Sequence, residues 1–299
     1  MNNSSETFLK SYKIAGVTFT VETDFLFEHE KLGLFEAPAY GQPDIKVSAF
    51  HCEATVEPKP FGVSLLASSY MEVREDSGIY RFYYRSSADL YYCEYDSDSH
   101  SAKIFIRNEA LPNVKFGDFT FEDHFFFAIR DVFFFHCQQM GMIALHSSSI
   151  VYDGRAYLFS APSGTGKTTH TNLWEEYCGV KPLNGDVALL SVKEGAVYAH
   201  GLPWCGTSEK YSNQTVPLGH IVFLKRADFN EVTVMNAFEA ILNICSRSFS
   251  PNWSKTLSEK TLNIAKEIER LSPCLLLKCL PEKGAMVVIK DYIDKEKSR

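Results

Sequence analysis

One short glycine-rich segment constrains the fold of this chain more than any other feature. Residues 161–168 read Ala-Pro-Ser-Gly-Thr-Gly-Lys-Thr, with an apolar run at Ala156–Ser160 before them and a helical pattern from about Gly166 to Tyr177 after them. Small residues allow successive backbone N–H groups to curve around an anion, and the N-terminus of a following helix points its positive end at the same charge. The segment matches the P-loop, with alanine in place of the first glycine. It predicts an α/β fold that binds nucleotide phosphates on a strand–loop–helix unit, whereas a plain turn is the alternative.

The side chains of this loop have separate predicted roles in binding ATP and Mg²⁺. Lys167 is expected to reach the β- and γ-phosphates, and it is counted among the catalytic residues. Thr168 has its hydroxyl at the position that holds Mg²⁺ in such loops. The predicted nucleotide-binding residues are Ser163, Gly164, Thr165, Gly166, Lys167, Thr168 and Thr169.

A carboxylate for the metal follows the loop in the sequence. Asp186 ends the segment Leu183–Asp186, directly before the apolar run Val187–Leu190, and it lies 19 residues after Lys167. A magnesium-bound triphosphate needs such a carboxylate, usually at the end of a neighbouring strand. Asp186 is therefore predicted to bind the metal or to act as the catalytic base. The alternative is a turn residue ahead of a strand.

The first part of the chain is predicted to form a β-rich domain over residues 1–115. Side chains alternate at 79–85, and the segments 90–95 and 102–107 flank a polar turn at 96–101. This pattern is typical of an antiparallel meander with one aromatic face. That face is expected to belong to the core, and an exposed surface for a peptide partner is the alternative.

The second domain, over residues 116–299, is predicted to alternate helices and strands. A helix is expected over 121–140, where phenylalanines nearly surround the axis and favour burial between the two halves of the protein. Asp153-Gly154 is typical of a type I′ hairpin turn. The remaining predicted strands are 148–152, 155–160, 187–192, 196–200, 220–224 and 274–279, and the remaining helices are 236–246, 257–271 and 282–294.

Composition excludes several classes of function. The net charge of the 299 residues is −7, and the chain has no lysine- or arginine-rich run, which argues against nucleic acid as a partner. The 8 cysteines form no C-x-x-C pair and the histidines no H-x-x-x-H pair, so zinc is not expected. A chain of this length has core enough to fold without disulfides, so reduced thiols are expected, and a disulfide framework is the alternative. No stretch approaches the roughly 20 apolar residues of a membrane span, and the N-terminus has no apolar leader. We therefore expect a cytoplasmic protein with no membrane partner.

The second domain resembles the HPr kinase/phosphorylase family and, more distantly, the phosphoenolpyruvate carboxykinases. Ser163–Thr169 is similar to the carboxykinase loop and stands where the HPr kinase loop stands. His146 precedes Ala161 by 15 positions, as a functional histidine does in the HPr kinases. Asp186 matches the first of two adjacent aspartates, and Gly201-Leu202 matches part of the signature that follows them. The resemblance covers about residues 143–230 and implies a P-loop kinase core of the HPr kinase/PEP carboxykinase type.

The resemblance also implies an activity and roles for two residues. The expected reaction is the transfer of the γ-phosphoryl group of ATP to a hydroxyl, such as a serine of a peptide or protein. Asp186 would take the proton from that hydroxyl, and His146 would orient Asp186 or a phosphate oxygen. Two alternatives remain, which are a small-metabolite kinase with the same core and a non-catalytic nucleotide-binding regulator.

The sequence departs from the family pattern at several positions. Val187 stands in place of the second aspartate, and Tyr198 in place of the acidic residue before Gly201. Arg247 and Lys210 are the candidates for the phosphate-binding arginines of the relatives. Loss of the second aspartate favours the regulator over the kinases.

Four further residues fall close to the predicted site. The loop 203–208 follows a predicted strand, and we expect its Trp204 to line the substrate cleft. Cys205 is the alternative as a nucleophile, but the sequence shows no base that would activate it. His170 and His200 are predicted to be structural residues or to lie at the rim of the site.

Overall fold

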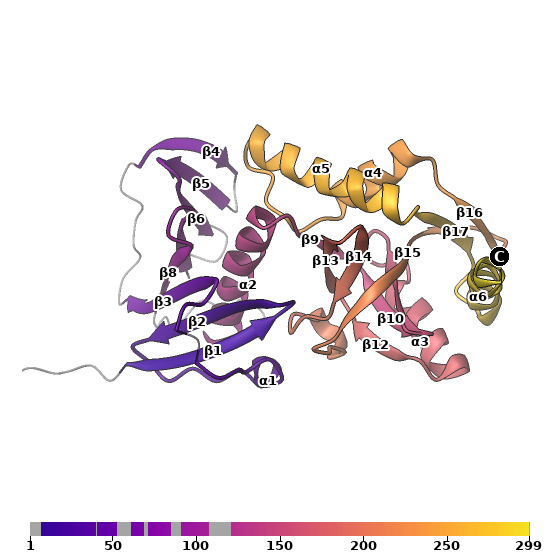
Figure 1. The fold of residues 1–299 in the computed structure, drawn as a ribbon, viewed down its shortest axis with the longest axis horizontal. Helices are drawn as coiled ribbons and strands as arrows, with labels where there is room; N and C mark the ends of the chain where they lie inside the picture. The colour runs from indigo at the N-terminus through magenta and orange to yellow at the C-terminus, as the bar shows by residue number, and fades with distance from the viewer. Residues whose placement is uncertain are drawn as a thin grey trace, which may run out of the picture. The chain divides into compact units, whose positions relative to one another are not determined.

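A computed structural model describes residues 7–39, 41–52, 61–68, 71–84, 91–107 and 121–298 (Figure 1). The chain forms two compact units. Unit 1 comprises residues 1–136 and 252–257, and unit 2 comprises residues 137–251 and 258–299. The division falls at 136/137 and not at the expected 115/116, because the aromatic side chains of one long helix pack within unit 1.

Unit 1 is built on an eight-stranded sheet with the strand order β1-β2-β3-β8-β7-β6-β5-β4. Its elements are β1 (Phe8–Ile14), β2 (Val17–Thr23), α1 (Glu30–Gly33), β3 (Ile45–Cys52), β4 (Val63–Ala67), β5 (Met71–Asp76), β6 (Ile79–Tyr84), β7 (Tyr91–Asp96), β8 (Ser101–Arg107) and α2 (Phe121–Gln139). β6, β7 and β8 pair antiparallel, which confirms the predicted meander. Residues 85 and 90 of the predicted strands lie outside the described residues.

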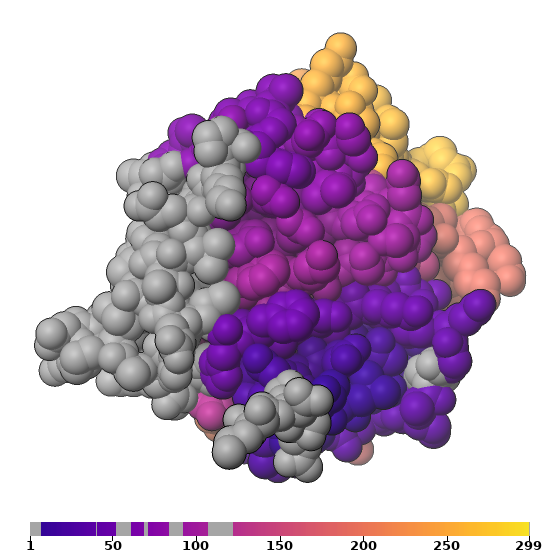
Figure 2. All heavy atoms as spheres, turned by 90° about the vertical axis from the view of Figure 1, so that its left-hand side faces the viewer, coloured from indigo at the N-terminus to yellow at the C-terminus, as the bar shows by residue number. Residues whose placement is uncertain are grey.

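The aromatic residues of unit 1 form its core. Phe133 of α2 lies 5.7 Å from Phe19 of β2 between ring centroids, and Phe135 lies 4.9 Å from Tyr95 of β7. All four side chains are buried, so the predicted aromatic core is confirmed for these residues. Figure 2 shows part of α2, in magenta, at the surface of this unit, although most of its described side chains are buried.

Unit 2 has a mixed α/β architecture, which confirms this part of the predicted fold class. Its elements are β9 (Ile143–His146), β10 (Ser148–Tyr152), β11 (Arg155–Ser160), α3 (Lys167–Cys178), β12 (Lys181–Asn184), β13 (Val187–Lys193), β14 (Ala196–His200), η1 (Gly206–Ser208), β15 (Thr215–Arg226), β16 (Glu231–Val234), α4 (Ala237–Ser246), α5 (Lys255–Leu271), β17 (Leu275–Cys279) and α6 (Lys283–Lys297). The predicted hairpin between β10 and β11 is confirmed, and both Asp153 and Gly154 have positive φ angles, as a type I′ turn requires.

The long strand β15 joins the two halves of the unit 2 sheet. Its first residues pair antiparallel with β14, and its last residues lie parallel to both β11 and β17. The sequence predicted only residues 220–224 of this strand. It also missed β9, β12 and β16, which are 4 residues each and too short to show a clear period.

Alternating side chains of β11 pack on both faces of the sheet. Tyr157 and Phe159 join a buried cluster with residues of α3 and α6, whereas Ala156 and Leu158 join a second cluster with residues of α4 and α5. Helices therefore cover both faces, as expected for strands that are buried on both sides. Because β11, β15 and β17 are parallel, the chain leaves all three strands at one edge of the sheet. The glycine-rich loop lies at this edge.

No helix in the described part of the chain is both long enough and apolar enough to span a membrane.

Candidate functional site

The glycine-rich loop connects β11 to α3 and depends on two glycines. Gly164 has φ +72° and Gly166, the residue that caps the N-terminus of α3, has φ +113°. L-residues with a Cβ rarely adopt these angles. No atom lies within 4 Å of the position where a Cβ of Gly164 would stand, so the loop is open on that side. The turn is closed by the Thr165 N–H, which donates to the Pro162 carbonyl at 3.2 Å.

Lys167 is the charged side chain of the loop, and it is turned inward. It is only 9% exposed, and its Nζ donates to the Ala161 carbonyl at 3.2 Å. Burial lowers the pKa of this ammonium group, the carboxylate of Asp186 raises it, and the positive charge of Arg247 lowers it further. A carboxylate and a second cation therefore lie close to the lysine at the loop.

The hydroxyl residues of the loop are more accessible than Lys167. Ser163, Thr168 and Thr169 are exposed. Thr168 lies in the first turn of α3. Its backbone carbonyl accepts a hydrogen bond from the Thr171 hydroxyl at 3.1 Å. Among the described residues, no group of three or more His, Cys, Asp or Glu side chains could hold a metal ion.

His146 and Asp186 meet at the ends of two paired strands. β9 and β13 are antiparallel, and His146 is the register partner of Val187. His146 Nε2 lies 3.2 Å from Asp186 Oδ1, and both side chains are partly exposed. The Ser147 N–H donates to the Asp186 carbonyl at 2.9 Å, which fixes the backbone next to this pair. The structure thus brings together Lys167, Asp186 and His146, the three residues predicted to be catalytic.

A buried amide, which the sequence reasoning missed, holds Asp186 in place. Asn184 is 0% exposed, and its Oδ1 accepts from the N–H groups of Asp186 at 2.8 Å and Val187 at 2.9 Å. Its Nδ2 donates to the carbonyls of Leu202 at 2.7 Å and Trp204 at 3.1 Å. Asn184 therefore joins the turn before β13 to the loop after β14. The Asn-Gly-Asp sequence at 184–186 is a turn signal that could have pointed to this role.

Gly206 packs directly against the carboxylate of Asp186. It has φ +59°, and a Cβ at this position would lie 3.0 Å from Asp186 Cγ and 3.2 Å from its Oδ2. The expectation that Trp204 lines a cleft is wrong, because this side chain is only 3% exposed. The loop is drawn inward by the hydrogen bonds of its carbonyls to Asn184. Gly206, and not the indole, is the part of this loop that meets Asp186.

Residues 125–281 match the family described as SynChlorMet cassette protein ScmC, which is more than half of the chain. The chain belongs to the ScmC family. No curated protein matches it. Among solved structures, the HPr(Ser) kinase/phosphatase from Coxiella burnetii is similar, with 10% sequence identity and a TM-score of 0.32. That similarity covers 52% of this chain and 98% of the other. The ScmC match includes the glycine-rich loop, His146 and Asp186.

Two basic residues within the ScmC match have different surroundings. Lys210 Nζ lies 2.5 Å from Glu175 Oε1 and 2.7 Å from Asn172 Oδ1, both on α3, so its charge is already paired. Arg247, at the C-terminal end of α4, is half-buried, and its positive charge lowers the pKa of Lys167. Of the two candidates, Arg247 is therefore the better placed to bind a phosphate at the loop.

The two histidines considered in the sequence analysis, His170 and His200, are buried. His170 accepts a hydrogen bond from Trp174 Nε1 at 3.2 Å, and burial lowers its pKa to about 4. His200 lies between the hydroxyls of Ser191 at 2.8 Å and Thr215 at 2.9 Å, and burial lowers its pKa to about 4 as well. Both are neutral at pH 7, and His170 in addition lines a cavity beside the loop.

Proposed function

We propose that this ScmC-family chain binds ATP on the glycine-rich loop and transfers its γ-phosphoryl group to a hydroxyl, such as a serine of a peptide or protein. The observation that carries the proposal is the position of Lys167. Its ammonium group donates a hydrogen bond to the Ala161 carbonyl, and the negative charge of Asp186 raises its pKa. A phosphate-binding cation and a carboxylate that can accept a proton therefore belong to one site.

The loop backbone, the N-terminus of α3 and two basic side chains would bind the phosphates and neutralise their charge. The backbone of the loop and the N-terminus of α3 favour an anion at this position. Lys167 and Arg247 provide two positive charges for the transferred group. Phosphoryl transfer needs little covalent chemistry from the protein, so positioning and charge are its main contributions.

The residues at the loop also fit Mg²⁺. This ion is commonly held by one or two protein groups together with substrate phosphates and water, rather than by a full protein cage. Thr168, with its exposed hydroxyl, and Asp186 would hold it. When bound, Mg²⁺ would offset the negative charge of the phosphates. Val187 is 2% exposed and replaces the second aspartate with an apolar side chain, so Asp186 carries the metal and base roles alone.

Asp186 is proposed to be the general base. The acceptor hydroxyl gives its proton to Asp186, its oxygen forms the new P–O bond, and the bond from the γ-phosphorus to the bridging oxygen breaks as ADP leaves. His146 Nε2, at 3.2 Å from Asp186 Oδ1, orients the carboxylate so that its other oxygen faces the acceptor. A positioned base of this kind contributes about 10²- to 10⁴-fold to the rate.

The second candidate is a non-catalytic nucleotide-binding regulator. The observation that favours it is the buried Val187, which removes one charge from the site. A tight pocket closed by Trp204 would favour a small-metabolite kinase, but Trp204 is buried, so this feature gives that alternative no support.

Asp186→Asn separates the kinase from the regulator. The variant keeps the shape of the side chain, so ATP should still bind, and transfer of ³²P from ATP to serine-containing peptides should fall by about 10²- to 10⁴-fold. Asp228→Asn changes an exposed carboxylate elsewhere in the unit and should transfer at the wild-type rate. Equal transfer by both variants would contradict the role of Asp186. ATP binding by the wild type without transfer to peptide or metabolite acceptors would favour the regulator.

A further inference from the structure

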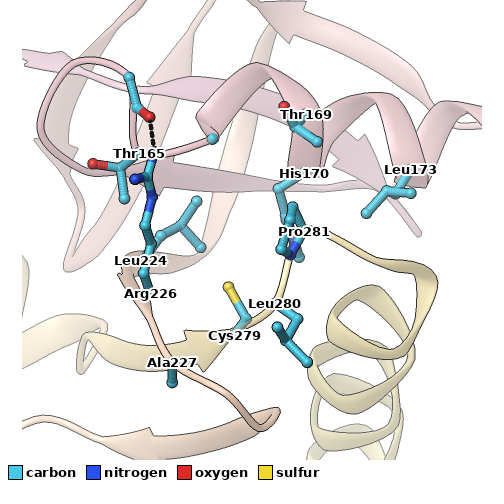
Figure 3. Close-up of a pocket in the computed structure, with 12 residues that line it drawn as sticks. Thr165, Thr169, His170, Leu173, Leu224, Arg226, Ala227, Cys279, Leu280 and Pro281 are labelled. Atoms are coloured by element: carbon cyan, nitrogen blue, oxygen red, sulfur yellow. Dashed lines mark hydrogen bonds between the residues drawn. The ribbon is translucent and has the colours of Figure 1, made fainter.

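A cavity of about 450 Å³ opens beside the glycine-rich loop. Figure 3 shows it between the loop and α3 on one side and the ends of β15 and β17 on the other. These two strands are parallel to each other, and β15 is parallel to β11, so the cavity lies at the edge where all three strands end. Ligands of open α/β sheets bind in crevices at this edge.

The wall that faces the loop is largely apolar. Leu173 comes from α3, Leu224 from β15, and Leu280 and Pro281 from the segment after β17 (Figure 3). Cys279, the last residue of β17, points its sulfur into the same space. Apolar cavities of about 300 to 1,000 Å³ with a few polar groups are typical small-molecule sites. This one suits a flat organic group.

Arg226 connects the cavity to the loop. It is the last residue of β15, and its Nη2 donates a hydrogen bond to the Gly164 carbonyl (Figure 3). The guanidinium group has five N–H donors in a planar fork, so donors remain for a second acceptor. An anionic group at the border between the loop and the cavity would meet them.

We propose that this cavity receives the nucleoside half of the nucleotide, with the phosphates running over the loop toward Lys167 and Asp186. The inference rests on the proposed function and adds the direction in which the nucleotide lies. Asp186 and His146 do not belong to the cavity wall, so the reacting end and the nucleoside end lie on different sides of the loop. Arg226 stands where the nucleoside meets its first phosphate, and its free donors would bind that α-phosphate.

On the side of β15 and β17 the wall offers few hydrogen-bonding groups for the edge of a base, whereas its polar residues Thr165, Thr169 and His170 lie on the side of the loop and α3. The Ala227 N–H already donates to the Cys279 carbonyl at 3.1 Å, and the Leu280 N–H donates to Asn230 Oδ1 at 3.0 Å. Sites that read a polar edge by hydrogen bonds reach about 10⁴- to 10⁵-fold selectivity, whereas apolar pockets discriminate far less. A base that lies against the β15 and β17 side is therefore held by packing, and ATP and GTP should bind within about tenfold of each other.

Alkylation of Cys279 tests the cavity without relying on turnover. Cys279 and Cys245 are both half-buried, and burial raises the pKa of both thiols, so Cys245 is a matched control outside the cavity. The full chain is treated with iodoacetamide at alkaline pH, and each site is quantified by peptide mass spectrometry. ATP and GTP should protect Cys279 alone, while inorganic tripolyphosphate, which displaces ATP from the loop, should leave Cys279 reactive.

Each other outcome overturns a stated part of the inference. If tripolyphosphate and ATP compete but ATP leaves Cys279 reactive, the nucleoside lies elsewhere and the proposed function still stands. If ATP protects Cys279 and Cys245 equally, protection is not local and the cavity is not the site. A preference for ATP over GTP above about 10³-fold contradicts recognition by packing alone. If neither ATP nor tripolyphosphate binds, the proposed function itself fails.

A variant that fills the cavity gives an independent measurement. Cys279 lines the cavity and points its sulfur into it (Figure 3), so Cys279→Trp places a large side chain in the space. ATP affinity should fall at least about tenfold while tripolyphosphate affinity stays unchanged. Asp228→Trp adds the same group at an exposed position outside the cavity wall and should change neither affinity. Equal affinities of Cys279→Trp and the wild type for ATP, or equal losses for both ligands, would overturn the inference.

Discussion

Replacing Gly206 by alanine is expected to displace the carboxylate of Asp186 while the protein stays folded. A Cβ at residue 206 would lie 3.0 Å from Asp186 Cγ and 3.2 Å from its Oδ2, so the carboxylate must move by a few tenths of an ångström. The φ angle of +59° adds strain to the backbone. Alanine in this region costs about 1–2 kcal/mol, and a gain of about 0.4–1 kcal/mol from the less flexible unfolded chain offsets part of it. The net loss of stability should be about 1 kcal/mol.

Gly195→Ala provides the matched control for this change. Gly195 has φ +75°, and no atom lies within 4 Å of its Cβ position, so alanine there meets the same backbone strain without a contact. Urea unfolding should therefore show a loss of about 1 kcal/mol in each variant. Transfer of phosphate from ATP should fall only in Gly206→Ala, by about 10- to 100-fold, because small misplacements of a catalytic group are costly.

Two results would refute this reasoning. If Gly206→Ala transfers phosphate as fast as Gly195→Ala, the position of Asp186 does not limit the reaction. If both variants lose activity to the same extent, the loss follows from stability, and the contact between residue 206 and Asp186 has no separate effect.

Three further predictions concern the loop and the buried histidines. Lys167→Ala should weaken ATP binding and abolish turnover with an unchanged circular dichroism spectrum, and normal turnover would contradict a phosphate site at the loop. Thr168→Val should lose the Mg²⁺ dependence of activity but keep some nucleotide affinity through the backbone N–H groups, and a titration of Mg²⁺ with no effect on either protein would contradict this role. Burial lowers the pKa of His170 and of His200 from 6.5 to about 4, so the unfolded chain binds protons that the folded chain does not. The stability that each contributes is fully present above pH 6.5 and is lost as the pH falls toward 4, by about 2 kcal/mol each near pH 5. Urea midpoints should therefore drop between about pH 7.5 and pH 5 and drop less in the His170→Gln/His200→Gln double variant; equal drops would show that these histidines do not titrate in this way.

Local sequence patterns alone predicted the strand–loop–helix unit that contains the candidate site. The spacing of Gly164, Gly166 and Lys167 indicates where the backbone turns and where α3 begins, because positive φ angles and helix starts depend on neighbouring residues. The Asp153-Gly154 hairpin followed from the same kind of local signal. These features need no information about residues far away in the chain.

The tertiary structure decided which distant residues meet at this loop. His146 reaches Asp186 because β9 pairs with β13; the family resemblance implied that the two residues act together, but no residue period marked the 4-residue strand β9 that brings them together. Asn184 and Gly206 act on Asp186 across a turn and a loop that come together only in the folded chain. Arg226 and the cavity beside it depend on the parallel placement of β11, β15 and β17. Period and spacing encode local backbone geometry, whereas the pairing of strands depends on the burial of whole faces, and no short segment specifies that by itself.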